Sequence, residues 1–418
     1  MRIFLIFFLL PIFAFCQVGF STFGIVGNGT DETANLQTAL DSGNNLINDV
    51  GGVFLISSTL HIDQSGDQDI DWNGATLTTT NTLNPMLDIS KLAGGGKVTM
   101  NDLTVDGNDD ALRGIKIRTP VNFTNVDVEF IKQLPTGSPS AMGMFIEITN
   151  DTDAFGNYDF DGCDIKEITG ENNGDLINSQ GAAYGMYISW KTVPINPVTI
   201  NFRNAIVEKC LGEDASPFYF YNASGAYRIG TSSSHHYFTN VIVREWERRG
   251  VKGFSGGQTW TNCHLIDGNA ADQTGTQLAA GIYAGAAYDN TNLTFEGCTF
   301  DGNAGAADRD PRIIFNNVSN VRINNCEFIN GADLVFTTNV GDINICSTTF
   351  GVGSTTTALS VSVQTGPLRF DIDNIYLNGK DFTNMNGMTI TETDLVCGTG
   401  NPNPAASDCK DCTFGLMN

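Results

Sequence analysis

The sequence predicts an all-β protein folded as a single-stranded right-handed parallel β-helix. Three observations lead to this prediction. A short motif recurs along most of the 418 residues, and its apolar and polar residues alternate with the period of a strand. Only 16% of residues are charged, while Gly numbers 46 and Thr, Asn and Ser are plentiful, which is typical of strands joined by many turns.

The recurring motif reads apolar-x-aromatic-x-Asn-Cys-x-apolar. It is clearest in QTWTNCHL from Gln258, LTFEGCTF from Leu293 and VRINNCEF from Val321. Copies begin at positions 98, 121, 158, 200, 236, 258, 293, 321, 343, 368 and 388. Subtracting neighbouring positions gives spacings from 20 to 42 residues, which indicate stacked repeats. We therefore expect about eleven or more coils, each pairing with the coil above and below.

Two motif positions have predicted structural roles. The fifth holds Asn or Gly, which tolerate a left-handed bend, and stacked Asn amides can bond the next coil. The sixth often holds Cys, where we expect a small side chain facing the interior. A reactive or metal-binding column of thiols is the alternative. The residues are Asn125, Asn204, Asn240, Asn262, Asn325, Gly162 and Gly297 at the fifth position, and Cys163, Cys263, Cys298 and Cys326 at the sixth.

The chain begins with a predicted signal peptide, residues 1–16. Arg2 supplies the positive end, an apolar stretch follows, and Ala14 with Cys16 are the small residues before cleavage. We therefore expect a secreted or periplasmic protein, with a surface lipoprotein anchored through Cys16 as the alternative. The predicted divisions are a cap segment with a helix at residues 17–52, the β-helix at 53–396 and a cysteine-bearing tail at 397–418.

The tail carries Cys397, Cys409 and Cys412. In an exported protein these cysteines indicate a disulfide that fastens the tail. A zinc site is the alternative, but no His lies near them to complete it.

The net charge of −24 argues against nucleic acid as a partner, because phosphates require a basic surface. No later stretch is apolar enough to span a membrane. An anionic substrate would need a local basic site or a bridging divalent cation such as Ca²⁺; no cofactor is certain.

The segment FGIVGNGTDETANLQTALDSG, residues 23–43, resembles the opening of the pectate-lyase-like β-helix superfamily. Asp31 or Thr30 can cap a helix from Asp31 to Leu40, whose apolar side would cover the first coil. The resemblance covers about fifty residues specifically, since the rest matches only by its coil pattern. It implies the fold and leaves the chemistry open, because this superfamily holds lyases, hydrolases, epimerases, esterases and non-catalytic binders.

In this superfamily the substrate groove runs along the strand that precedes the motif. Aromatic and charged residues at outward positions of this strand would form a line across several coils, suited to stacking sugar rings and holding uronate or sulfate. A tyrosine-rich face without function is the alternative. The expected line comprises Lys116, Arg118, Glu147, Tyr187, Tyr219, Tyr221, Lys252 and Tyr283.

The segment REWERRGVKG, residues 244–253, is the strongest cluster of basic residues. For a lyase acting on a uronate, Lys252 or Arg249 could neutralise the carboxylate or act as base, and Tyr219 or Tyr221 could donate a proton. We expect Arg248 and the nearby His235 and His236 to contact substrate. Solvated ion pairs on a loop are the alternative interpretation of this segment.

A hydrolase would instead need paired carboxylates. Asp106, Asp109 and Asp110 are candidates, but DGN recurs at Asp267 and Asp301, which indicates a turn. Asp159, Asp161 and Asp164 in YDFDGCD are weak candidates for a Ca²⁺ site. The usual signatures of polygalacturonase-type hydrolases and of typical pectate lyases are absent from the sequence.

The sequence therefore predicts an exported protein that binds an acidic polysaccharide and cleaves it by β-elimination. The alternatives are a non-catalytic adhesin or tailspike-like glycan binder and a glycoside hydrolase on the same fold. The chain would act as a monomer or a homotrimer.

Overall fold

The computed structural model describes most of the chain in segments. These are residues 17–63, 66–90, 96–133, 139–148, 156–170, 182–190, 198–212, 215–222, 235–247, 249–252, 257–266, 280–283, 290–302, 312–316, 318–330, 332–337, 343–351, 357–361, 368–376, 381–383 and 388–396. The predicted signal peptide and the tail cysteines Cys397, Cys409 and Cys412 lie outside the described residues, as does Arg248.

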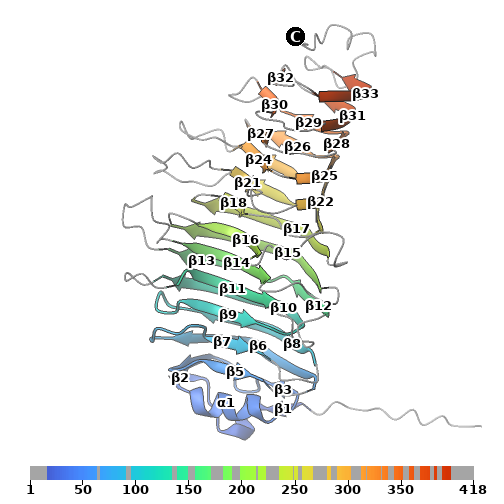
Figure 1. Ribbon diagram of the computed structural model, residues 1–418. Coiled ribbons are helices and arrows are strands. Elements are labelled where there is room, and N and C mark those ends of the chain that lie inside the picture. The colour runs from blue at the N-terminus through green and yellow to red at the C-terminus, as the bar shows by residue number, and fades with distance from the viewer. Residues whose placement is uncertain are drawn as a thin grey trace, which may run out of the picture.

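The strands stack as successive coils of a right-handed parallel β-helix, which rises from the N-terminal end to the C-terminal end in Figure 1. Twelve strands form one face, here called sheet B: β5 (Leu60–Ile62), β7 (Leu87–Ile89), β9 (Arg113–Ile117), β11 (Ala141–Ile148), β14 (Ala183–Trp190), β16 (Ser216–Asn222), β18 (Arg249–Lys252), β21 (Ala280–Tyr283), β24 (Arg312–Asn316), β27 (Asp333–Thr337), β30 (Thr357–Val361) and β32 (Asp381–Thr383).

The other 21 strands form sheet A: β1 (Val18–Gly19), β2 (Asn28–Asp31), β3 (Leu46–Ile47), β4 (Val53–Ile56), β6 (Gln68–Thr79), β8 (Val98–Asp106), β10 (Val121–Lys132), β12 (Gly156–Asp161), β13 (Ile165–Thr169), β15 (Val198–Leu211), β17 (His235–Trp246), β19 (Gly257–Thr261), β20 (His264–Ile266), β22 (Asn290–Glu296), β23 (Thr299–Asp301), β25 (Val318–Asn324), β26 (Glu327–Ile329), β28 (Ile343–Cys346), β29 (Thr349–Phe350), β31 (Leu368–Tyr376) and β33 (Met388–Val396). The recurring motif lies on this sheet, as its copies at Val121 and Val321 show.

Sheet A bends along its length at the predicted Asn corner. In β10 the residues before Asn125 pair with β12 and those after it pair with β13. Asn125 itself has a φ of 52°, and Asn204, Asn240, Asn262 and Asn325 have φ between 50° and 55°. The left-handed bend that the sequence predicts at this position is therefore confirmed.

The corner amides bond to the neighbouring coil, although their acceptors differ from the prediction. Asn240 Nδ2 donates to Asn204 Oδ1 at 2.9 Å, as a ladder of amides requires. Elsewhere the acceptor is a carboxylate: Asp102 for Asn125 at 2.8 Å and Asp161 for Asn204 at 2.7 Å. The amide ladder is therefore a mixed amide–carboxylate ladder, in which charged acceptors strengthen the bonds.

A second left-handed corner follows the first by five residues, and the sequence did not reveal it. Its residues are Phe130, Glu167, Lys209, Glu245 and Asn330, each with φ of 53° to 55°. Four of the five are residue types that rarely adopt this conformation. Stacking of one coil on the next therefore imposes this bend, because local preference opposes it.

The interior is filled by columns of apolar side chains, one from each coil. Phe238 stacks on Trp260 with ring centroids 4.1 Å apart, and Phe328 stacks on Phe350 at 4.6 Å. The predicted inward cysteines are buried, and burial raises the pKa of the Cys163 thiol to about 12. A thiol held neutral in an apolar interior is unreactive, which favours the structural interpretation of the cysteine column.

The first coil is covered by helix α1 (Thr33–Asp41), which follows the short 3-10 helix Phe20–Phe23. Its buried residues are Leu36, Ala39 and Leu40, the side that the sequence predicted to cover the coil. The helix begins two residues later than expected, because Asp31 ends strand β2 and its Oδ1 accepts the backbone N–H of Thr33 at 3.0 Å. Within the described residues, no helix has the length and hydropathy needed to cross a bilayer.

Replacing Trp260 by Ala should destabilise the fold by about 3–5 kcal/mol, because the wholly buried ring would leave a cavity beside Phe238. The change should appear as a lower urea midpoint monitored by circular dichroism. Tyr237→Ala on the outer side of β17, where the residue is 44% exposed, is the control and should cost less than about 1 kcal/mol. Equal losses in the two variants would contradict the assignment of Trp260 to the core column.

Candidate functional site

Chemically active side chains form a row on the outer face of sheet B. Backbone pairing aligns Asp88, Lys116, Phe145, Tyr187, Tyr219, Lys252 and Tyr283 in consecutive register across β7 to β21. We call these seven residues the outer column. Neighbouring parallel strands lie about 4.8 Å apart, so residues some 30 positions apart in sequence become neighbours. The predicted alignment of the three tyrosines with Lys252 is thus confirmed for the backbone; the Tyr283 side chain lies outside the description.

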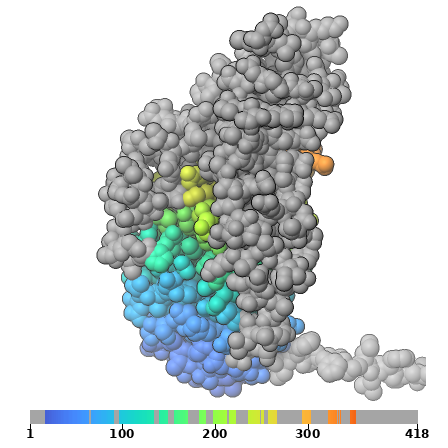
Figure 2. Space-filling view, in the orientation of Figure 1, coloured from blue at the N-terminus to red at the C-terminus, as the bar shows by residue number. Residues whose placement is uncertain are grey.

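A second row lies beside the outer column, and sequence reasoning missed it. It contains Arg113, Met142 and Tyr184, which are also in register. Met142 and Tyr184 join Phe145 in a hydrophobic cluster separate from the core. In Figure 2 the described part of this region forms a strip from cyan to yellow on the face turned to the viewer.

Glycine explains how this second row reaches the outer face. A Cβ on Gly114 would lie 2.4 Å from Cγ1 of the core residue Val128, so this position faces inward as Ile115 does. Two successive inward residues shift the alternation, which leaves Arg113 and Lys116 on the same outer face. The signal in the sequence is a repeated x-Gly-apolar-x pattern: RGIK at 113, MGMF at 142, YGMY at 184, RGVK at 249 and AGIY at 280.

Four tyrosines form a close cluster at the centre of this face. The Tyr219 ring lies 4.8 Å from Tyr184 and 5.1 Å from Tyr187. Tyr221, in the next position along β16, lies 6.0 Å from Tyr187. Tyr184 is only 4% exposed, whereas the other three are half-buried. Burial raises the pKa of Tyr187 above its ordinary range, so its hydroxyl stays protonated at neutral pH and can donate a hydrogen bond.

Cations lie over these rings. Lys252 Nζ is 4.3 Å from the centroid of Tyr219 and 5.6 Å from that of Tyr184. The Arg113 guanidinium carbon is 5.0 Å from the centroid of Phe145. Such contacts hold a positive charge against an aromatic surface, where it can meet an anionic group of a ligand.

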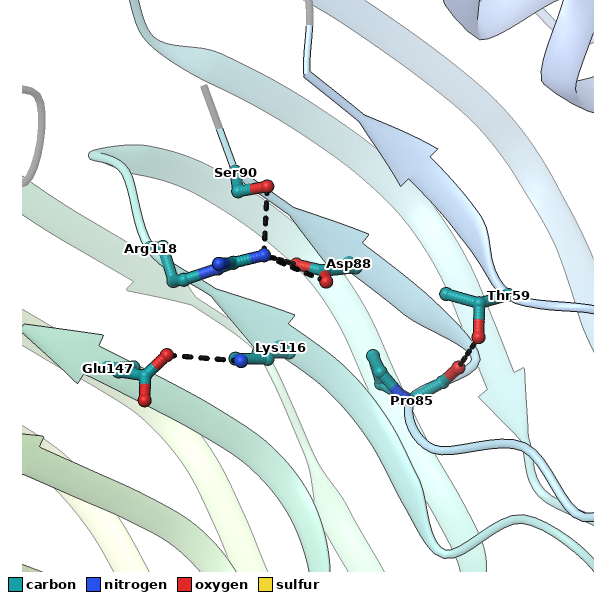
Figure 3. A network of polar contacts seen from close by, with 7 residues as sticks. All are labelled: Thr59, Pro85, Asp88, Ser90, Lys116, Arg118 and Glu147. Carbon is teal, nitrogen blue, oxygen red and sulfur yellow. Dashed lines mark hydrogen bonds and ion pairs between the residues drawn. The ribbon is translucent and has the colours of Figure 1, made fainter. Parts of the chain in front are cut away.

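Ion pairs occupy the N-terminal end of the face, as Figure 3 shows. Arg118 donates to both carboxylate oxygens of Asp88, at 3.0 and 2.9 Å, and to Ser90 Oγ at 3.0 Å. Lys116 Nζ lies 3.0 Å from Glu147, which is 4% exposed. The predicted substrate ligands Lys116, Arg118 and Glu147 therefore bind partners within the protein, and substrate binding by them stays a prediction.

A shallow cleft lies at the N-terminal end of the outer column. It is lined by side chains of α1 and β5 and of the turn before β5, including Gln37, Ser57, Thr59 and His61. His61 pairs in register with Asp88, so the cleft continues the outer column by one strand. Hydroxyl and amide groups there suit hydrogen bonds to sugar hydroxyls.

The two predicted histidine ligands do not lie on this face. Both belong to β17 of sheet A. His236 is wholly buried, and its Nδ1 accepts the backbone N–H of Ile200 at 3.3 Å. The placement of His236 at the substrate site was therefore wrong, because alternation along β17 turns it into the core. His235 faces outward, but its Nε2 bonds Thr259 Oγ1 at 2.8 Å on sheet A.

The basic segment that looked like one cluster is divided between the two sheets. Arg244 lies near the end of β17 on sheet A, where it pairs with Glu208, while Arg249 and Lys252 lie on β18 of sheet B. Arg249 is 8% exposed and occupies the place in the glycine pattern that Arg113 has on β9. The alternative interpretation, solvated ion pairs on a loop formed by Arg244, Glu245, Glu247 and Arg248, holds for Arg244 only as an ion pair with Glu208, because Arg244 lies on a strand; Arg248 lies outside the described residues.

Each of the three weak candidates for a metal ligand, Asp159, Asp161 and Asp164, binds a different partner within the protein. Asp159 pairs with Lys97 at 2.9 Å, and Asp161 pairs with Arg203 at 2.9 Å. Asp164 accepts the backbone N–H of Ile206 at 2.8 Å. Within the described segments, no three His, Cys, Asp or Glu side chains are grouped closely enough to hold a metal ion. The clustering that suggested Ca²⁺ in the sequence is therefore a set of contacts between coils.

Comparison with known proteins identifies the fold. No protein-family model and no curated protein matches the chain. ORF18 of Geobacillus virus E2 is similar in structure, with a TM-score of 0.51 and 15% identity, covering 88% of this chain and 62% of that one. The fold that the two chains share is the parallel β-helix.

Other solved structures are similar at lower scores. The A-module of the Azotobacter vinelandii mannuronan C-5 epimerase AlgE6 has a TM-score of 0.47 and 11% identity, covering 90% of this chain and 98% of that one. Bacteriophage CBA120 tailspike protein 3 has a TM-score of 0.42 and 11% identity, covering 93% and 64%. The chain spans 62% of the length of the viral ORF18, and at such identities the likeness concerns the parallel β-helix fold alone.

The buried His236 should make stability depend on pH. Burial lowers its pKa from 6.5 to about 3, with a smaller effect of His235. The neutral ring favours the folded state above pH 6.5, and this contribution is lost as pH falls toward 3, by at most about 1.4 kcal/mol per pH unit. In urea unfolding at a series of pH values, His236→Asn should therefore lose stability less steeply over this range than the wild type. Parallel curves for the two proteins would contradict the buried neutral ring.

Proposed function

We propose that this protein is an exported glycan-binding protein that holds an acidic polysaccharide along the outer column of sheet B. The observation that carries the proposal is the register-matched row of aromatic and cationic side chains. Aromatic faces stack on sugar rings, and Lys and Arg pair with carboxylate or sulfate groups. Six steps of about 4.8 Å between Asp88 and Tyr283 give a row of about 29 Å, which suits a chain of sugars better than a single one.

The local charge supports an anionic ligand. Among the described residues between β7 and β18, the outer face carries five cations, Arg113, Lys116, Arg118, Arg249 and Lys252, against two carboxylates, Asp88 and Glu147. This local excess of three positive charges contrasts with the net charge of −24 for the whole chain. A positive strip on an acidic molecule attracts an anionic chain to that strip and disfavours binding elsewhere.

We further propose that the protein cleaves the glycan by β-elimination. In this reaction a base removes the C5 proton of a uronate, the C4–O bond breaks, a C4–C5 double bond forms and an acid protonates the leaving oxygen. Of Lys252 and Arg249, one would neutralise the uronate carboxylate and the other would act as base, and Tyr219 or Tyr221 would be the proton donor. Lys252 and Tyr219 lie side by side, which supports this assignment.

Hydrolysis is less well supported. It needs two carboxyl groups flanking the scissile bond. The two described carboxylates on this stretch of the face, Asp88 and Glu147, are each held in an ion pair. Binding without cleavage is the second candidate, and it is favoured by the close packing of the tyrosines, since Tyr184 is only 4% exposed.

The activity test incubates the purified protein with alginate, pectate and sulfated algal glycans, with and without Ca²⁺, and follows the ultraviolet absorbance of the unsaturated uronate. Rising absorbance with a uronate polymer is the expected result. Binding without any rise would support the non-catalytic candidate, and an absence of both would refute the proposed function.

Lys252→Ala should weaken binding of the preferred acidic glycan by about tenfold, because it removes a cation held against two tyrosine rings. Isothermal titration calorimetry measures the change. Lys166→Ala is the matched control. Lys166 lies on β13 of sheet A and pairs with Glu129, so its replacement should leave the affinity for the glycan unchanged. Equal effects of the two substitutions would show that only overall charge matters and would refute a site on sheet B.

A further inference from the structure

Arg113 differs from the other cations of this face. Its Nε is buried without a hydrogen-bond acceptor, as are those of Arg118 and Arg249, but unlike Arg118 its side chain has no ion pair among the described residues. The guanidinium is 5.0 Å from the centroid of Phe145. Lys116 and Arg118, its neighbours on the same stretch of chain, instead bind Glu147 and Asp88.

The environment of Arg113 makes the charge of its guanidinium unfavourable when no anion is bound beside it. Burial lowers its pKa, while the nearby Glu147 and Tyr187 act in the opposite direction. An arginine side chain remains charged even so. A partly desolvated charge without a partner destabilises its surroundings, and a bound anion would remove that penalty.

The available edge of the guanidinium limits which anion fits. Nε is buried, so the two terminal nitrogens remain to meet a ligand. Each terminal nitrogen contributes one N–H to a parallel pair. A planar carboxylate accepts this pair with its two oxygens, one hydrogen bond to each. The half-buried ring of Tyr187, which lies 5.3 Å from the buried ring of Phe145, provides an apolar surface for the sugar that carries the carboxylate.

We propose that Arg113 recognises the carboxylate of a uronic acid and so determines which acidic glycan the outer column binds. This inference rests on the proposed function, because it assigns the specificity of the same face. It concerns a residue on β9, four strands along sheet B from Lys252 on β18, at which the reaction is proposed. Arg113 is thus a binding residue of a separate sugar position along the chain.

The experiment measures the affinity of the full chain for three ligands: an oligouronate, the same oligosaccharide with its carboxyls reduced to alcohols, and a sulfated neutral oligosaccharide. Wild type should bind the oligouronate about ten- to hundredfold more tightly than the reduced form. Arg113→Gln should lose most of this preference while still binding the reduced form. Arg113→Lys should recover only part of it, because lysine lacks the planar fork.

Arg203→Gln, which alters an arginine paired with Asp161 on sheet A, is the matched control and should keep the preference. Far-ultraviolet circular dichroism and thermal melting establish that each variant is folded. Undiminished preference in folded Arg113→Gln would overturn the role of Arg113 and leave the proposed function intact. Tighter binding of the sulfated ligand than of the oligouronate, lost in Arg113→Gln, would overturn the carboxylate assignment. Binding of none of the three ligands by wild type would instead refute the proposed function itself.

Discussion

The parallel pairing of each coil with the next is the constraint on which the rest of the structure depends. Hydrogen bonds between strands hold equivalent residues of successive coils about 4.8 Å apart, so each position of the repeat becomes a column. Inside the helix, the columns are apolar and include the stacked Phe238 and Trp260. At the first corner they are Asn residues bonded to amides or carboxylates of the neighbouring coil. On the outer face of sheet B, the same repetition creates a row of aromatic and charged groups.

The sequence could predict the columns whose residue types are chosen locally. Asn125 and its equivalents need a left-handed conformation, and Cys163 fills an inward position, so both left a readable pattern. The second corner could not be predicted, because Phe130 and Glu167 adopt the same bend only under the stacking of neighbouring coils. The motif copy that begins at His236 puts this histidine at an inward apolar position, so its burial could have been predicted from the sequence.

The candidate site divides in the same way. The backbone register between strands aligns Tyr187, Tyr219 and Lys252, and the sequence was sufficient to predict this alignment. The neighbouring row with Arg113 and Tyr184 was missed because strict alternation would turn these residues inward. The glycine after each of them, visible in the sequence as x-Gly-apolar-x, shifts that alternation. Ion pairing between coils, as in Lys116 with Glu147, depends on side-chain reach across strands and left no pattern in the sequence.

The crystal structure of the protein with an oligouronate is the most direct test of the account. If residues of separate coils act as one binding row, the sugar chain will cross the strands of sheet B, with rings over Tyr187 and Tyr219 and a carboxylate at Arg113. An oligosaccharide bound on sheet A, or lying along a single coil without contacting successive strands, would contradict it.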